Sequence, residues 1–415
     1  MPRIMLLLPT TTYRASDFLA AARRMNIEVV AASEKPNVMA DRHPDSLLTL
    51  NFRDVEGSAR RVSEFHKNNP LDAIIPVDDD TAVLAAAIAA ALSLPHNSVA
   101  SARAARDKYV LSDLLRQHGL PSPKSRLFSI EQHPEAVAAD ANYPCVLKPL
   151  FLSASRGVIR ADDPPSFIAA WKRIRLILAQ PEVASRGGEA SNQIMVQDFV
   201  PGIEFALEGL LSGGQLRVLA LFDKPDPLDG PFFEETLYIT PSRHAASVQQ
   251  DIVACVAQAT RAIGLQEGPI HAELRVNEKG PWIIELAARS IGGLCSRTLR
   301  FGTGFSLEEI ILRQALGMEI DPERESKAAG VMMIPIPGAG ILREVRGLDS
   351  ARVVSGIEEL TISAHIGKTL IPLPEGSSYL GFIFSRGEDP TAVEQSLRQA
   401  HARLEFVVDA RGTSA

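Results

Sequence analysis

The stretch 268–293, GPIHAELRVNEKGPWIIELAARSIGG, constrains the fold of this chain more than any other part of its sequence. Two apolar runs, at 270–276 and 282–286, lie on either side of a turn-type cluster at 277–281 that contains Asn, Gly and Pro. Short β-rich runs separated by a Gly-containing turn are typical of an antiparallel hairpin. We therefore expect two adjacent strands in this stretch.

The register of the hairpin predicts which side chains meet. With a turn centred on Lys279, the pairs across the ladder are Glu273 with Glu285, His271 with Ala287, and Arg275 with Ile283. Side chains two apart share one face of a strand. His271, Glu273 and Arg275 are therefore expected to point the same way, with Glu285 beside Glu273.

The two opposed glutamates need a partner. Like charges directly opposite each other destabilise a ladder, and on an apolar hairpin they also cost desolvation. A divalent cation between Glu273 and Glu285 would remove both costs, because Mg²⁺ binds carboxylates together with substrate phosphates. A surface hairpin with two solvated glutamates is the alternative that this stretch leaves open.

The charge balance argues against two classes of partner. The chain has 415 residues and a net charge of -7, whereas broad binding to nucleic acid or to an anionic membrane needs a basic face. Cys145, Cys255 and Cys295 lie far apart and show neither a disulfide framework nor zinc spacing, which indicates a reducing, cytoplasmic compartment. The apolar run 82–94 is too short to span a bilayer and is expected to be a buried helix.

The first hundred residues alternate strands with helices. Strands are expected at 3–8, 27–32 and 73–77, and helices at 14–25, 59–68 and 82–94. This alternation is typical of parallel βαβ units, so we expect an open α/β domain. The sequence PTTT at 9–12, after the first strand, lacks the glycines of a dinucleotide site. The acidic triplet 78–80 is expected to cap the following helix.

An anion site is indicated in the next segment. Lys148 ends the apolar strand 144–149, where an anion must offset the burial of an ammonium group. The loop 153–158 offers backbone N–H groups and the Arg156 guanidinium to phosphate oxygens. A helix is expected at 103–119, with Lys108 near its start, and the polar stretch 181–192 is expected to be a loop.

The segment 193–205 suits an adenine nucleotide. It is predicted as strand, hinge, turn and strand, and its apolar residues could stack on adenine while exposed backbone bonds the base. Glu204 could accept hydrogen bonds from a ribose; an ordinary hairpin is the alternative. The acidic loop 223–235 could contact a substrate amine or be solvated, and the tail 328–415 is predicted as a small α+β lobe.

Taken in order, these features resemble the ATP-grasp superfamily. The residues that carry the resemblance are Asp107-Lys108, the strand 146–149, the loop 153–158, the hinge 197–204, Glu273, Glu285 and Arg289. The resemblance covers about 106–316. The sequence ELAAR at 285–289 and the C-terminal lobe are most similar to the L-amino-acid ligase (dipeptide synthetase) branch, with biotin-carboxylase-type enzymes a more distant likeness.

The resemblance implies an α/β and α+β multidomain chain. A Rossmann-like pre-ATP-grasp domain would span 1–105, the ATP-grasp fold 106–318, and a small C-terminal α+β lobe 319–415. The ATP-grasp fold would consist of two α+β subdomains. The first, about 106–195, would carry the phosphate loop, and the second, 196–318, would carry the metal and substrate groups.

The resemblance also implies roles for residues at the matching positions. The phosphates of ATP would be held by Lys108, Lys148 and the loop Ser155-Arg156-Gly157. The nucleoside would lie against Gln197, Phe199, Val200 and Glu204. Mg²⁺, or Mn²⁺ in its place, would be bound by Glu273 and Glu285. Catalysis would rest on Lys148 and Arg289, and the substrates would meet His271, Glu234, Glu235, Gly292 and Gly293.

Two of these positions need comment. Much of the superfamily has a metal-binding Asn where this chain has Ala287, and the dipeptide-ligase branch often shows the same Ala. His271 could act as a base for the amine; a structural histidine on a strand is the alternative, which we favour because the sequence reveals no oriented partner for it.

The implied function is ATP-dependent ligation of a carboxylate and an amine through an acyl phosphate, with release of ADP and phosphate. Amino acids are the expected substrates, and a dipeptide or amide is the expected product. No nucleic-acid or membrane partner is expected, and a homodimer is left open. The alternatives are a biotin-carboxylase-like enzyme that uses bicarbonate, and a non-catalytic ATP-binding module.

Overall fold

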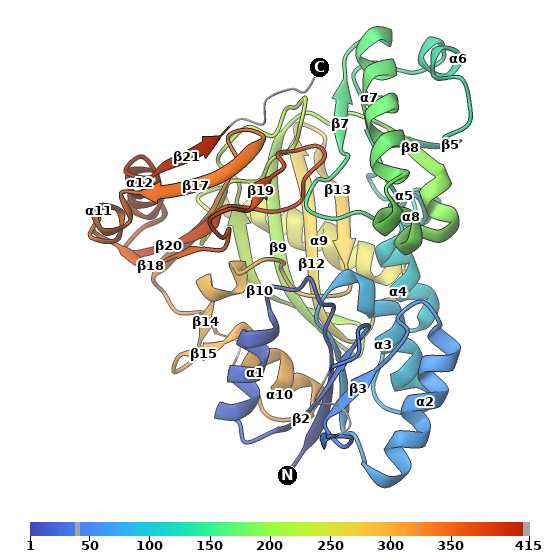
Figure 1. The fold of residues 1–415 in the computed structure, drawn as a ribbon, viewed down its shortest axis with the longest axis vertical. Coiled ribbons are helices and arrows are strands. Elements are labelled where there is room, and N and C mark those ends of the chain that lie inside the picture. Colours follow the sequence, from blue (N-terminus) through green and yellow to red (C-terminus); the bar gives the residue numbers. More distant parts are fainter. Residues whose placement is uncertain (38–41, 322, 410–415) are drawn as a thin grey trace.

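The N-terminal domain is a parallel sheet with helices on both sides (Figure 1). The computed structural model of the protein describes residues 1–37, 42–321 and 323–409. Its first sheet has the order β3-β2-β1-β4 and is entirely parallel, which confirms the predicted open α/β domain. The elements are β1 (Arg3–Leu7), α1 (Ala15–Arg24), β2 (Glu28–Ser33), β3 (Leu47–Thr49), α2 (Val55–Asn68), β4 (Ala73–Pro76) and α3 (Asp79–Ala91).

The strand order of this sheet creates a crevice. The chain passes from β1 to β2 and β3 on one side and then crosses to β4 on the other. Ligand sites in open α/β sheets lie at such a reversal, outside the carboxyl ends of the strands. Asp78 follows β4 and forms a capping box with Thr81, which confirms the predicted cap of α3. The crevice is thus bordered by the start of α3.

The helix expected at 103–119 is divided in two. Asp107 ends α4 (Val99–Arg106) and begins α5 (Lys108–Gln117), and its side chain accepts hydrogen bonds from the backbone N–H groups of Tyr109 and Val110. An aspartate in the N-cap position satisfies amides that a continuing helix would have bonded internally. The break places Lys108 at the first position of a helix rather than in its middle.

Residues 125–198 form a separate layer, here called the cap subdomain. Its antiparallel sheet has the order β5-β8-β6-β7. The strands are β5 (Ser125–Ser129), β6 (Cys145–Lys148), β7 (Ile159–Ala161) and β8 (Gln193–Asp198), and the helices are α6 (Pro134–Ala139), α7 (Pro164–Leu178) and α8 (Pro181–Gly187). The loop predicted at 181–192 is wrong: α8 begins with Pro181, whose restricted φ suits a first helical position, and a 3₁₀ helix (Gly188–Asn192) follows.

One antiparallel sheet of eight strands organises the rest of the chain (Figure 1). In sheet order, its strands are β13 (Gly280–Ala287), β12 (Gly268–Asn277), β9 (Ile203–Ser212), β10 (Gln215–Asp223), β11 (Leu237–Thr240), β16 (Ala328–Ile334), β20 (Gly381–Gly387) and β18 (Ile357–Ile362). The last three belong to the predicted C-terminal lobe. That lobe therefore shares a sheet with the segment before it, through the pairing of β11 with β16.

The faces and ends of this sheet are covered by the remaining elements. They are α9 (Ala246–Ala262), β14 (Arg300–Phe301), β15 (Phe305–Ser306), α10 (Leu307–Ala315), β17 (Gly340–Arg346), α11 (Leu348–Arg352), β19 (Thr369–Leu370), α12 (Pro390–His401) and β21 (Glu405–Asp409), with a short 3₁₀ helix (Cys295–Thr298). The N-terminal domain packs here, because Ile4 and Phe18 share one apolar core with Phe222 and Ile310. The large sheet is thus joined to the N-terminal domain by a shared apolar core.

The predicted hairpin is formed by β12 and β13, with a tighter turn than expected. The turn consists of residues 278 and 279, since Asn277 already pairs with Gly280. Arg275 consequently lies opposite Trp282, so its predicted pairing with Ile283 is wrong.

A β-bulge restores the pairing on which the candidate site depends. Ile284 has no partner in the ladder, and beyond it Glu273 pairs with Glu285 and His271 with Ala287, as predicted. If the ladder continued without the bulge, Glu273 would lie opposite Ile284, and the Glu285 side chain would face the other side of the sheet.

Two further properties of the described residues concern the length of the helices and the state of the cysteines. Every helix in the described ranges falls short of the length and hydrophobicity needed to cross a bilayer. Cys145, Cys255 and Cys295 are buried free thiols, and burial raises the pKa of the first two to about 12 and about 11. Such thiols are unreactive at neutral pH.

Candidate functional site

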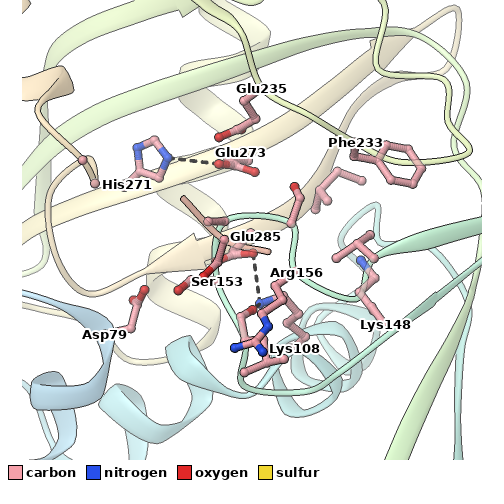
Figure 2. A pocket seen from close by; sticks show the side chains of 18 of the residues that line it. Asp79, Lys108, Lys148, Ser153, Arg156, Phe233, Glu235, His271, Glu273 and Glu285 are labelled. Atoms are coloured by element: carbon pink, nitrogen blue, oxygen red, sulfur yellow. Dashed lines mark hydrogen bonds and ion pairs between the residues drawn. The ribbon is translucent and has the colours of Figure 1, made fainter. Parts of the chain in front are cut away.

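A cavity of about 540 Å³ lies where the N-terminal domain, the cap subdomain and the large sheet meet (Figure 2). Most of the predicted site residues line it: Lys108, Lys148, Ser155, Arg156, Gln197, Phe199, Val200, Glu204, Glu235, His271, Glu273, Glu285, Arg289, Gly292 and Gly293. Two do not. The carboxylate of Glu234 accepts from the backbone of Ile336, and the amide of Gly157 donates to the carbonyl of Pro374.

Lys148 and Lys108 bring two positive charges to one end of the cavity. Lys148 is the last residue of β6 and only 4% exposed, and Lys108 donates to the carbonyl of Leu152 at 3.0 Å. Burial, together with the neighbouring charge of Lys108, lowers the pKa of Lys148 to about 8. A buried ammonium group with a lowered pKa gains from an anion beside it, which suits Lys148 to phosphate oxygens.

We expect nucleotide affinity to weaken as the pH rises through about 8. The ammonium form of Lys148 falls from most of the population at pH 7 to about a tenth at pH 9, so affinity for Mg-ADP should drop by about tenfold. Calorimetric titration of the wild type at both pH values measures this. Lys148→Gln should bind weakly and without that slope, whereas His271→Gln should retain it. A flat wild-type profile would contradict the assignment.

The predicted phosphate loop, residues 153–158, has an unusual backbone. Ala154, Ser155 and Gly157 all have positive φ, at 54°, 53° and 73°. Residues other than glycine rarely adopt this region, and such strained positions cluster in ligand-binding loops. Successive free amides in such a loop can attract anions, but here the amides of Arg156, Gly157 and Val158 donate to the carbonyls of Ser153, Pro374 and Ser155. The predicted role of Ser155 and Arg156 in phosphate binding stays a prediction.

The predicted nucleoside side of the cavity contains an arginine that the sequence did not reveal there. The Arg275 guanidinium lies 5.0 Å from the Phe199 ring centroid, donates to the carbonyl of Val200 at 2.9 Å, and donates to Glu204 Oε2 at 3.0 Å. Gln197 is buried and donates to Ser125 at 2.9 Å. These contacts hold the predicted adenine-facing segment in one conformation. Its contact with adenine stays a prediction.

Glu273 and Glu285 are the predicted magnesium ligands. Both side chains lie on the cavity side of the hairpin (Figure 2). Lys108 Nζ lies 3.1 Å from Glu285 Oε2, and Lys224 Nζ lies 3.6 Å from Glu273 Oε1, so each carboxylate has its own lysine here. Carboxylate oxygens beside lysines suited to phosphates fit Mg²⁺ bound together with a nucleotide.

Lys224 is the centre of a charged cluster that sequence reasoning missed. Its buried ammonium group lies 2.9 Å from Glu204 Oε1 and also contacts Glu235. Burial lowers the pKa of Lys224, but Glu204, Glu235 and Glu273 outweigh it and hold the pKa well above its ordinary value. Oxygens of these three carboxylates lie within 4.8 Å of one another, so the cluster could also accommodate a metal ion. Lys224 follows an apolar strand, as Lys148 ends one, and that signal could have found it.

His271 has an oriented partner in the structure. Glu208, which is fully buried in β9, lies opposite His271 and bonds its Nδ1, while Nε2 lies 3.2 Å from Glu273 Oε1. Burial lowers the pKa of His271, but Glu208 and Glu273 outweigh it and raise the pKa to about 9. A protonated ring engaged at both nitrogens is unsuited to act as a base. We interpret His271 as a positioning group for Glu273.

Arg289 is directed into the site by the N-terminal domain. Its Nη2 donates to Asp79 Oδ2 at 2.8 Å, and its Nη1 donates to the carbonyl of Ser290 at 3.0 Å. Burial lowers the pKa of Arg289, but the charge of Asp79 outweighs it, so the guanidinium keeps its proton. Asp79 begins α3 at the crevice of the parallel sheet, so a residue expected only to cap a helix also orients Arg289.

Three family models match successive parts of the chain. An ATP-grasp N-terminal domain matches residues 19–96, an ATP-grasp domain matches 141–298, and an L-amino acid ligase C-terminal domain 2 matches 332–409. The order of the three matches is the order that the sequence predicted.

Two known proteins are similar in sequence to about two thirds of this chain. Carnosine synthase 1 from Homo sapiens is 27% identical over 291 residues, which are 67% of this chain and 35% of that protein. Alanine–anticapsin ligase from Bacillus subtilis (strain 168) is 23% identical over 311 residues, which are 71% of this chain and 65% of that protein. This chain therefore aligns with about a third of the first protein and just under two thirds of the second.

A solved structure shares the fold over the full length. The crystal structure of an L-amino acid ligase from Bacillus licheniformis has a TM-score of 0.80 at 24% identity and covers 99% of both chains. This likeness confirms the predicted multidomain architecture with a central ATP-grasp fold.

Proposed function

This chain is an ATP-grasp protein, and from that premise we propose that it joins a carboxylate to an amine at the expense of ATP. The observation that carries the proposal is one cavity that gathers Lys108 of α5, Lys148 of the cap subdomain, and Glu273, Glu285 and Arg289 of the large sheet and the loop that follows it. Amino acids are the proposed substrates, because carnosine synthase and alanine–anticapsin ligase are named for amino-acid amide products or substrates.

The proposed reaction requires positioning more than covalent catalysis. A substrate carboxylate attacks the γ-phosphate of ATP, which gives an acyl phosphate and ADP; an amine then attacks the acyl carbon and releases phosphate. The ammonium of Lys148 and the fork of Arg289 would hold the transferring phosphoryl group, because preorganised positive charge stabilises that transition state. Asp79 keeps the Arg289 fork in place before substrate arrives.

Magnesium would be held by Glu273 and Glu285 and would neutralise phosphate charge. The chain's own residues prepare that position: Glu208 holds His271, and His271 bonds Glu273. Burial raises the pKa of Glu273, but Lys224 and His271 outweigh it and keep the pKa well below its ordinary value, so that carboxylate is ionised. An ionised, oriented carboxylate is the form that binds a hard cation.

A screen of amino-acid pairs tests the proposal. Purified chain with Mg-ATP and each pair should release ADP and phosphate in equal amounts, and mass spectrometry should find the condensed product. A pair that works should raise ADP release by about tenfold or more over ATP alone, because bound substrates exclude water and supply the nucleophiles. ADP release that no carboxylate–amine pair stimulates would refute the ligase assignment.

The same screen separates the alternatives. ADP release that depends on bicarbonate would favour the biotin-carboxylase-like reaction, and ATP binding without turnover would favour a non-catalytic module. The two glutamates and Arg289 in one cavity support catalysis over simple binding, since binding of ATP alone does not need an arginine held beside the predicted metal ligands.

The biological setting is a separate part of the proposal. Three buried free thiols support a reducing, cytoplasmic location, and the net charge of -7 supports the absence of nucleic-acid and anionic membrane partners. A homodimer stays a prediction, which light scattering of the purified chain would test.

A further inference from the structure

The segment 371–379, here called the strap, connects β19 to β20 and reaches from the C-terminal part of the chain to the cap subdomain (Figure 1). The strap contains a tight turn at Gly376. The amide of Gly376 donates to the carbonyl of Pro372 at 2.9 Å, and a Cβ on Gly376 would lie 1.8 Å from the carbonyl oxygen of Ile371. Only glycine fits at this position, because a side chain would collide with the Ile371 carbonyl.

One end of the strap binds the cap subdomain through three independent contacts. The Glu375 carboxylate accepts from Arg173 Nε at 2.8 Å and Nη2 at 2.9 Å. The Glu375 carbonyl accepts from Arg156 Nε at 2.9 Å, and the Pro374 carbonyl accepts from the Gly157 amide at 2.9 Å. The last two contacts are made to the phosphate loop itself. A bidentate arginine–carboxylate pair is the strongest and most directional of these interactions.

The other end of the strap forms part of the cavity wall. Ser377, Ser378 and Tyr379 all line the cavity. Tyr379 packs edge-on against Phe382 at 6.0 Å between ring centroids, and burial together with the charge of Glu235 raises the pKa of its phenol well above the ordinary value. The strap therefore touches the phosphate loop on one side and the cavity near Glu235 on the other.

We propose that Glu375 is a positioning residue for the ligase reaction, which holds the phosphate loop against the strap. The Arg173 pair fixes the strap to the cap subdomain, and this places the two strap carbonyls where Arg156 and Gly157 bond them. Closure of the loop over a nucleotide and formation of the wall at Ser377–Tyr379 are then a single event. Water is excluded from the acyl phosphate only while the strap is in place. This inference rests on the proposed function for its consequence, although the contact itself does not.

Hydrogen exchange measures the positioning role directly. With Mg²⁺ and a non-hydrolysable ATP analogue, amides 153–158 should exchange about tenfold faster or more in Glu375→Ala than in the wild type, because the loop loses its anchor. Glu358→Ala is the matched control. Glu358 lies in the same lobe, is similarly exposed at 35% against 36%, and also pairs with arginines, with Arg300 at 2.9 Å and with Arg386 at 3.3 Å. It should leave those amides unchanged.

Coupling of ATP use to product gives the second readout. With an acid–amine pair found active in the screen, the wild type should form about one amide for each ADP. Glu375→Ala should release at least about twofold more ADP than amide, as water competes for the acyl phosphate. Arg173→Ala removes the other partner of this ion pair and should show the same excess of ADP over amide. It provides the same test if Glu375→Ala does not fold. The charge exchange Glu375→Arg with Arg173→Glu should restore coupling in part.

The outcomes separate this inference from the proposed function. An unchanged exchange rate at 153–158 in both Glu375→Ala and Arg173→Ala overturns the positioning role, whatever the ligase assay gives. Equal exchange in Glu375→Ala and Glu358→Ala, both faster than the wild type, also overturns it, since the effect is then a general loosening of the lobe. A wild type that makes no amide with any pair, while the exchange result holds, refutes the ligase proposal alone.

Discussion

The Glu285→Ala variant is expected to release ADP about 10²- to 10³-fold more slowly than the wild type under saturating Mg-ATP and substrates. Glu285 faces Glu273 across the hairpin, and its only ion pair in the described ranges is the one with Lys108 at 3.1 Å. Its removal takes away one of the two carboxylates that would hold the metal and leaves Lys108 without its counter-charge. Coupled assay of ADP over a range of Mg²⁺ concentrations measures the loss.

Glu394→Ala is the matched control for this variant. Glu394 is exposed to a similar extent, 18% against 23%, and pairs with Arg243 and Arg398, but it lies outside the cavity. It should keep wild-type turnover. Raised Mg²⁺ should recover part of the Glu285→Ala activity, because a site that has lost one ligand binds the metal more weakly rather than not at all. Equal ADP release by Glu285→Ala and the wild type would remove the basis of the metal assignment.

The Arg14→Met variant is expected to lower the free energy of unfolding by about 3–5 kcal/mol. Arg14 Nη2 lies 2.9 Å from Glu308 Oε1, with the two side chains only 1% and 3% exposed, and Nη1 donates to Ser290 at 2.7 Å. The substitution leaves the Glu308 carboxylate buried without its counter-charge, at the junction of the N-terminal domain with α10. Urea denaturation followed by circular dichroism measures the change.

The chain offers an internal control for the buried pair. Arg24 also pairs with a glutamate of α10, Glu309, at 3.1 Å, but Arg24 is 53% exposed. Glu309 is only 7% exposed, but the Ser306 amide still donates to it when Arg24 is removed. Arg24→Met should therefore cost only about 1 kcal/mol, because water reaches the Arg24 side of the pair. The double substitution Arg14→Met with Glu308→Leu should recover most of the loss, since no charge then stays buried. A cost for Arg14→Met as small as that for Arg24→Met would contradict the argument.

The Glu285 and Arg14 variants test two pairings that arise in different ways. The pairing of Glu273 with Glu285 follows from a hairpin whose two strands are adjacent in the sequence, and local patterns predict such pairs. The pairing of Arg14 with Glu308 joins residues 294 positions apart. Sequence patterns do not contain that information, because it depends on how the N-terminal domain docks on the large sheet.

The predicted register of the hairpin was right for one pair of residues and wrong for another. The expected turn centred on Lys279 and the observed two-residue turn differ by one position, and the bulge at Ile284 cancels the difference beyond it. The prediction for Glu273 was confirmed and the prediction for Arg275 was wrong, although both came from the same register. A bulge is decided by the packing of neighbouring strands, so the sequence alone did not reveal it.

The sequence by itself determined the class of the fold, the order of its units, and most of the charged residues of the cavity. Its period-two and helical patterns are local, and lysines and glutamates in apolar strands are conspicuous because isolated buried charge is costly. Only the tertiary structure decided which charge meets which. Glu208 holds His271, Asp79 orients Arg289, and Glu375 holds the phosphate loop. Coulombic interactions and hydrogen bonds act over a few ångströms, and the distances that set them arise only when distant strands pair and separate units pack together.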